Sequence, residues 1–100
     1  MLWAISCVSK PKDEVAAIRA KFRQGHSDYL KSKANIIFFA GPTQSDDGTE
    51  NLGSLWIVNV NSRAEAQSFS DGEPYTSAGV FSSVTITRVR KGHFHPELAG

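Results

Sequence analysis

The chain has 100 residues, of which 40% are hydrophobic and 21% are charged, so we expect one globular domain over residues 1–100. The formal net charge is only +1, which argues against nucleic acid or an anionic membrane as a partner. No apolar run could span a bilayer, and the N-terminus lacks the basic start of a signal peptide. The lone Cys7 excludes an internal disulfide, so we expect a reducing, cytoplasmic setting.

The first half of the chain alternates apolar runs with one amphipathic segment. Residues 2–8 are largely apolar and predict a strand, and apolar side chains at helical spacing predict a helix over residues 13–33. Residues 36–40 are apolar at every position, which is typical of a strand covered on both faces. Gly41-Pro42 is expected to end this second strand.

A polar loop over residues 43–51 leads to a third predicted strand, residues 55–60, which is again largely apolar on both faces. Ser62 and Glu65 then match a capping box, in which the serine caps a helix and the glutamate three residues later reaches back. This pattern predicts a second helix that ends near residue 70.

A tight turn precedes the last predicted strand. Gly72 can adopt the left-handed conformation that stops a helix, and Pro74 suits the first position of a new helical turn. Glu73 is therefore expected at a helix N-terminus, where free backbone N–H groups favour a carboxylate. Gly79 closes the turn, and residues 80–89 are rich in the Val, Ile and Thr of a strand.

The predicted element order is βαββαβ, followed by a tail over residues 91–100 with no clear element. With right-handed crossovers this order gives an α+β, ferredoxin-like fold: a four-stranded antiparallel sheet with two helices on one face. Because the inner strands offer apolar side chains to both faces, the uncovered face needs a cover. We therefore expect a homodimer through the sheet face away from the helices, with Val58 or Trp56 at the interface.

Proton transfer is the chemistry for which the chain offers candidates. Arg23 and His26 lie three residues apart on one helix face, and histidine suits proton transfer near neutral pH. A boundary histidine bonded to a backbone carbonyl is the alternative interpretation. Glu73 is a candidate acid or an ordinary turn carboxylate. Asp46 and Asp47 are possible substitutes, although Asp-Asp-Gly more often forms a plain turn.

The remaining candidates predict neither a metal nor an organic cofactor. His93 and His95 are two ligands without a third, which is weak evidence for a metal site. Cys7 is interpreted as a small core residue. The sequence contains no phosphate-binding glycine motif and no Ser/His/Asp arrangement that its spacing would reveal.

Five short motifs occur in order over nearly the whole chain. They are Arg23-x-x-His26, Phe39-Ala40-Gly41-Pro42, Gly53-Ser54, Ser62-x-x-Glu65-Ala66 and Glu73-Pro74-Tyr75-x-x-Ala78-Gly79-Val80. This ordered set resembles the YCII-related (YciI-like) family of small bacterial proteins. The resemblance implies a ferredoxin-like dimeric α/β barrel, in which a histidine and an acidic residue are thought to form an active site. One branch of the family dehydrohalogenates a chlorinated ring in aromatic degradation.

Carried over residue by residue, the resemblance implies His26 and Glu73 as the catalytic pair, although the family usually has aspartate at the second position. We further expect substrate-binding roles for Arg23, Gly41, Pro42, Ser54 and Tyr75, with the planar fork of Arg23 holding a substrate carboxylate. The expected activity is that of a lyase, isomerase or dehydrohalogenase acting on a small unsaturated or cyclic acid. The alternative is a non-catalytic dimer that binds a small ligand or assists a larger enzyme. Related dimeric barrels bind haem, which leaves His26 as an axial ligand as a third interpretation.

Overall fold

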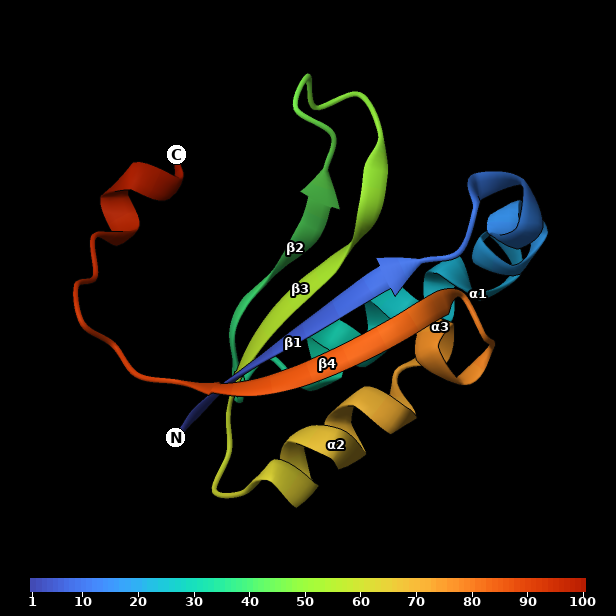
Figure 1. Cartoon of the computed structure of the whole chain (residues 1–100). Helices are drawn as coiled ribbons and strands as arrows, with labels where there is room; N and C mark the ends of the chain where they lie inside the picture. The colour runs from blue at the N-terminus through green and yellow to red at the C-terminus, as the bar shows by residue number, and fades with distance from the viewer.

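The computed structural model describes residues 1–100, and its elements follow the predicted order (Figure 1). They are β1 (Leu2–Ser9), α1 (Lys12–Ser32), β2 (Ile37–Gln44), β3 (Asn51–Asn59), α2 (Arg63–Gly72), α3 (Pro74–Ser77), β4 (Phe81–Val89) and the 3-10 helix η1 (Pro96–Ala99). The strands form one antiparallel sheet in the order β2-β3-β1-β4. Figure 1 shows the α-helices together on one side of this sheet. The predicted ferredoxin-like α+β fold is thus confirmed.

Helix α1 joins two hydrophobic clusters. Near its start, Val15 is buried in a small cluster with Tyr75 and Val80. Near its end, Tyr29 packs against the main core, where its ring lies 5.6 Å from that of Phe69 on α2. The middle of α1, which carries the predicted site residues, is therefore held in place at both ends.

The predicted capping box starts α2. The Ser62 hydroxyl accepts the Glu65 backbone N–H at 3.2 Å, and the Glu65 carboxylate reaches back to accept the Asn61 N–H at 2.7 Å. These bonds satisfy backbone donors that the first turn of a helix leaves without intrahelical partners.

The prediction that Gly41-Pro42 ends the second strand was wrong. Strand β2 continues to Gln44, with Gly41 opposite Leu55 and Pro42 opposite Ser54. Proline is tolerated there because β2 is an edge strand, where a missing N–H need not remove a ladder hydrogen bond. The loop consequently shortens to residues 45–50.

The prediction of a left-handed Gly72 was also wrong, because the glycines with positive φ are Gly48, Gly79 and Gly100. Gly72 is the last residue of α2, and a Cβ there would lie 2.9 Å from the Tyr29 hydroxyl oxygen. Space, rather than conformation, therefore favours glycine at this position. Gly79 does close the turn, with φ of 83°.

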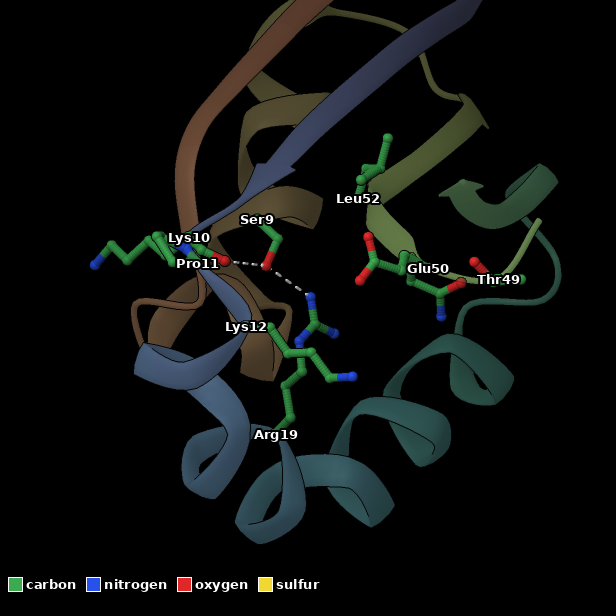
Figure 2. A pocket seen from close by; sticks show the side chains of 9 residues that line it. Ser9, Lys10, Pro11, Lys12, Arg19, Thr49, Glu50 and Leu52 are labelled. Atoms are coloured by element: carbon green, nitrogen blue, oxygen red, sulfur yellow. Dashed lines mark hydrogen bonds between the residues drawn. The ribbon is translucent and has the colours of Figure 1, made fainter. Parts of the chain in front are cut away.

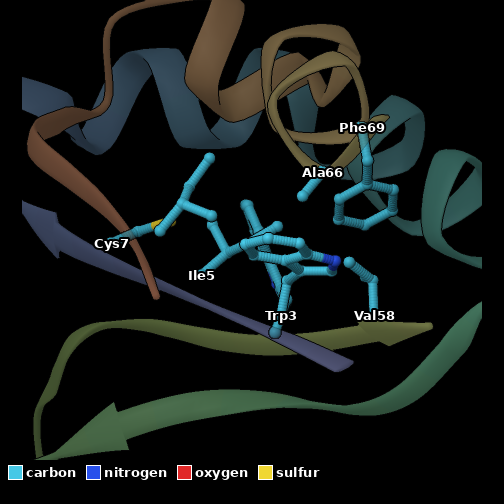
Figure 3. Close-up of a cluster of buried hydrophobic side chains, with 8 residues drawn as sticks. Trp3, Ile5, Cys7, Val58, Ala66 and Phe69 are labelled. Carbon is cyan, nitrogen blue, oxygen red and sulfur yellow. The ribbon is translucent and has the colours of Figure 1, made fainter. Parts of the chain in front are cut away.

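The main core lies between the sheet and α2, as Figure 3 shows. Trp56 and Val58 both belong to this core, with Ala66 and Phe69 of α2. The prediction that one of the two faces away from the helices was therefore wrong, because residues two apart on a strand share a face.

The sheet face opposite the helices is called the open face below. By the pleat and the strand register, it carries a group of apolar side chains: Leu2, Ala4, Val8, Phe39, Leu55 and Ile57. Val8 and Phe39 are 50% and 45% exposed. Separately, none of the helices combines the length and hydrophobicity needed to cross a membrane.

Candidate active site

Glu73 is the buried centre of the site. It links α2 to α3 and is 0% exposed. Its Oε2 accepts the Thr76 backbone N–H at 3.1 Å and the Thr76 hydroxyl at 3.4 Å, so it caps α3 as the sequence predicts. Burying a carboxylate is costly unless it is hydrogen-bonded or paired, so its partners are the key to the site.

His26 is the second partner of this carboxylate. Its Nδ1 is hydrogen-bonded to Glu73 Oε1, although the two residues are 47 positions apart in the chain. The imidazole is 22% exposed, and its Nε2 forms no hydrogen bond within the protein. The imidazole therefore contacts the buried carboxylate through Nδ1 and is partly open to solvent. With Nδ1–H donated to Glu73, Nε2 is the nitrogen available to accept a proton.

Tyr75 holds the imidazole from one side. The two rings are stacked, with centroids 4.1 Å apart and planes 12° apart. Tyr75 is buried, and its hydroxyl donates to the Arg19 carbonyl at 3.3 Å. The Arg19 guanidinium carbon also lies 5.1 Å from the Tyr75 ring centroid. Tyr75 thus restricts the orientation of His26. It also contacts Arg19, which lies seven residues before His26 on α1.

The negative charge of Glu73 affects two other groups, the buried Cys7 and the partly buried Tyr29. Burial, with a further contribution from Glu73, raises the pKa of the Cys7 thiol to about 12. The same two causes raise the pKa of Tyr29, whose hydroxyl donates to the Phe69 carbonyl at 2.7 Å. Both groups stay neutral near neutral pH, and neither supplies a nucleophile to the site.

An open hollow of about 450 Å³ lies above the imidazole. Its walls come from α1, from the β2–β3 pair and from α3. Besides His26, it is lined by all five residues for which the sequence predicts substrate binding, namely Arg23, Gly41, Pro42, Ser54 and Tyr75. Glu73 does not line the hollow, and its contact with a lining residue is the hydrogen bond to His26.

The alternative acids lie elsewhere. Asp46 and Asp47 occupy the exposed β2–β3 loop, where the Asp47 carboxylate accepts hydrogen bonds from the Ser45 and Thr49 hydroxyls, both at 2.8 Å. Hydrogen bonds from Thr49 and Ser45 lower the pKa of Asp47. These residues form a solvated turn, and the acid in contact with His26 is Glu73.

The tail histidines, His93 and His95, are exposed near the C-terminal end of the chain. His95 lies 3.4 Å from Glu97 at the exposed end of the chain. The protein contains no group of three or more His, Cys, Asp or Glu side chains placed to hold a metal ion.

Sequence reasoning assigned no site role to two residues that line the hollow, Arg19 and Gly53. Arg19 lies four and seven positions before Arg23 and His26, a helical spacing that places all three on one side of α1 and could have revealed it. Gly53 allows β1 and β3 to approach closely, since a Cβ there would clash with the Cys7 carbonyl oxygen. That clash is a tertiary contact and has no local sequence signal.

Comparison with known proteins identifies a family and similar solved structures. The family model of the YCII-related domain matches residues 1–90. Among solved structures, the chain is similar to 5-chloro-2-hydroxyhydroquinone dehydrochlorinase (TftG) from Burkholderia phenoliruptrix AC1100, in complex with 2,5-dihydroxybenzoquinone. The sequences are 28% identical, the TM-score is 0.79, and the similarity covers 92% of this chain and 96% of that chain. A search of curated proteins finds no significant match.

Proposed function

Because this chain belongs to the YCII-related family, we propose that it is an enzyme that transfers protons on a small unsaturated or cyclic acid. His26 and Glu73 are the proposed catalytic pair. The observation that supports this most is the hydrogen bond between a fully buried carboxylate and an imidazole that faces an open hollow. The similarity to a dehydrochlorinase makes dehydrohalogenation of a hydroxylated ring the first reaction to test.

In the proposed mechanism, Glu73 keeps the proton of His26 on Nδ1, so that Nε2 takes a hydroxyl proton from the substrate. The buried carboxylate stabilises the imidazolium that forms. The imidazolium then returns the proton to the ring carbon that carries the halogen. The halide leaves with its bonding electrons, and loss of a second hydroxyl proton gives a quinone. The net change is loss of HCl, so the reaction needs no oxidant.

The other residues of the hollow have proposed binding roles. Arg23 is exposed and forms no ion pair within the chain, so its planar fork is available for a substrate oxyanion. Ser54 offers a hydroxyl from β3, and Gly41 and Pro42 give a wall without long side chains. Tyr75 positions His26 by stacking and also lines the hollow.

Chloride release from 5-chloro-2-hydroxyhydroquinone tests the function. We expect turnover by the wild-type protein and a loss of about 100-fold or more in His26→Asn and in Glu73→Gln. Because the two residues act as a unit, the double variant should be barely worse than either single one. Asp47→Asn, in the solvated turn, is the matched acidic control and should keep full activity.

Two results would contradict the catalytic proposal. Full activity without His26 would show that the pair is not the proton-transfer group. Ring binding by the wild-type protein with no turnover of any halogenated or unsaturated ring acid would favour the alternative, a non-catalytic ligand-binding or accessory module.

We also propose that the protein is a homodimer joined through the open face. The apolar side chains there, two of them about half exposed, support this arrangement because isolated domains rarely leave such a patch uncovered. A single unpaired Cys7 supports a reducing, cytoplasmic location.

A further inference from the structure

A second hollow, of about 470 Å³, lies between the start of α1 and the β2–β3 hairpin (Figure 2). Its charged lining residues are Lys10, Lys12, Arg19 and Glu50, but the Lys10 ammonium lies beside Gly79 and points away from Arg19 (Figure 2). Arg19 and Asn51 line both this hollow and the one above His26. The two hollows are therefore neighbours on either side of Arg19 and Asn51.

Arg19 is held in a defined position at this junction. Its Nη2 donates to the Ser9 hydroxyl at 3.1 Å, and that hydroxyl donates to the Lys10 carbonyl at 2.9 Å (Figure 2). On its other side, the guanidinium lies against the Tyr75 ring. A guanidinium has five N–H donors, and the Ser9 bond uses one, so donors remain for a ligand.

The positive charge of this second hollow is not neutralised within the protein. The chain contains two ion pairs, His26–Glu73 and His95–Glu97, and neither involves a lysine or an arginine. Glu50 is the one acidic residue in the lining, and it forms no ion pair with Lys12 or Arg19. An excess of cationic groups in a concave site attracts anions.

We propose that this hollow is a subsite for a carboxylate of the substrate whose ring is bound beside His26. The proposal rests on the proposed function and narrows its substrate class to hydroxylated ring acids. Arg19 binds the carboxylate through its planar fork, and Lys12 adds positive charge from the start of α1. The Tyr75 ring contacts both the His26 imidazole and the Arg19 guanidinium, so the proposed subsite adjoins the place beside His26 where the ring is proposed to bind.

Two probes that differ by one carboxylate test the subsite. Binding of 2,5-dihydroxybenzoate and of hydroquinone is measured by NMR titration and calorimetry. In Arg19→Gln we expect the affinity for dihydroxybenzoate to fall by at least about tenfold, because charge-assisted hydrogen bonds are lost. The affinity for hydroquinone should change by less than about twofold, because its ring does not use those bonds.

Three further variants sharpen this experiment. Lys12 is exposed, so Lys12→Gln leaves the fold intact and should weaken the binding of dihydroxybenzoate but not of hydroquinone. This variant tests the subsite even if Arg19→Gln also loosens the packing of Tyr75. Glu50→Gln removes the opposing charge and should strengthen dihydroxybenzoate binding. Lys31→Gln makes the same charge change at the far end of α1, outside both hollows, and should alter neither probe.

The outcomes separate this proposal from the proposed function. Equal affinity of the wild-type protein for both probes, binding of neither, or unchanged dihydroxybenzoate binding in both Arg19→Gln and Lys12→Gln would overturn the subsite. If chloride release still requires His26 and Glu73 in that case, the proposed function stands without it. If dihydroxybenzoate binding requires Arg19 while chloride release does not require His26, the subsite stands and the proposed function fails.

Discussion

Glu73 influences side chains that it does not touch, because its carboxylate is completely buried. Water screens an exposed charge, whereas a buried charge acts over several ångströms. Cys7 on β1 shows the effect, since its pKa is raised from an ordinary value of 9.0 to about 12, chiefly by burial and also by Glu73. The thiol therefore reports on the charge state of the candidate catalytic acid.

Replacing Glu73 with glutamine should lower the pKa of Cys7. Removing the negative charge makes the thiolate less unfavourable, but burial persists, so the pKa should fall below about 12 and stay above 9.0. Thiolate absorbance followed against pH measures this shift. In Asp47→Asn, which changes an exposed loop carboxylate, the titration should not move. An unmoved Cys7 titration in Glu73→Gln would show that the charge of Glu73 does not reach β1.

The same thiol makes folding depend on alkaline pH. The unfolded chain loses its Cys7 proton near 9.0, whereas the folded protein keeps it until about 12. Above the lower value the folded state binds more protons, so the free energy of unfolding falls as pH rises through this window. Because Glu73→Gln should lower the pKa of Cys7 in the folded protein, it should also lower the upper limit of this pH range. Denaturation curves measured against pH therefore test the same pKa shift a second time.

At the level of helices and strands, two glycines with opposite surroundings test how closely the elements are packed. Gly25 lies inside α1, where a Cβ would be 3.8 Å from the Pro74 side chain, an ordinary contact. Gly53 lies on β3, where a Cβ would clash with the backbone of β1. Glycine inside a helix costs roughly 1 kcal/mol relative to alanine.

Gly25→Ala should therefore raise the free energy of unfolding by about 0.5–1 kcal/mol, because it gains helix propensity without a clash. Gly53→Ala should lower it by about 2 kcal/mol or more, because β1 and β3 must separate. Urea denaturation of both variants measures the two effects. Destabilisation by Gly25→Ala would show that α1 and α3 are closer than the 3.8 Å contact indicates.

For the whole molecule, we propose that the open face determines the oligomeric state. Leu55 and Ile57 point to this face because they alternate with the buried Trp56 and Val58. A lysine there leaves the core intact and makes face-to-face burial costly. The interface is therefore testable without damage to the core.

We expect the wild-type protein to sediment as a dimer at micromolar concentration and Ile57→Lys to give monomers or aggregates. Ala17→Lys adds the same charge to an exposed position of α1 and should remain dimeric. A wild-type monomer at micromolar concentration would contradict the dimer proposal.

Local rules in the sequence were sufficient for much of this protein. Hydrophobic period and cap residues predict the order of the elements, and that order with right-handed crossovers determines the ferredoxin-like fold. The place of Glu73 at the start of α3 follows from Pro74 and from the capping preference of a carboxylate. These features depend on neighbours within a few residues, so a single sequence carries them.

The tertiary structure alone decided which residues meet. The sequence analysis gave Glu73 as the first candidate partner of His26 and left Asp46 and Asp47 open as substitutes. The packing of α1 against the α2–α3 turn brings Glu73 to His26 across 47 positions. The predicted strand over residues 55–60 is largely apolar on both faces, so its sequence does not show which face meets the core and could not assign Trp56 to it. The Arg19 contact with Tyr75 likewise joins distant segments. Such contacts are long-range and follow from the fold, whereas sequence patterns report local geometry.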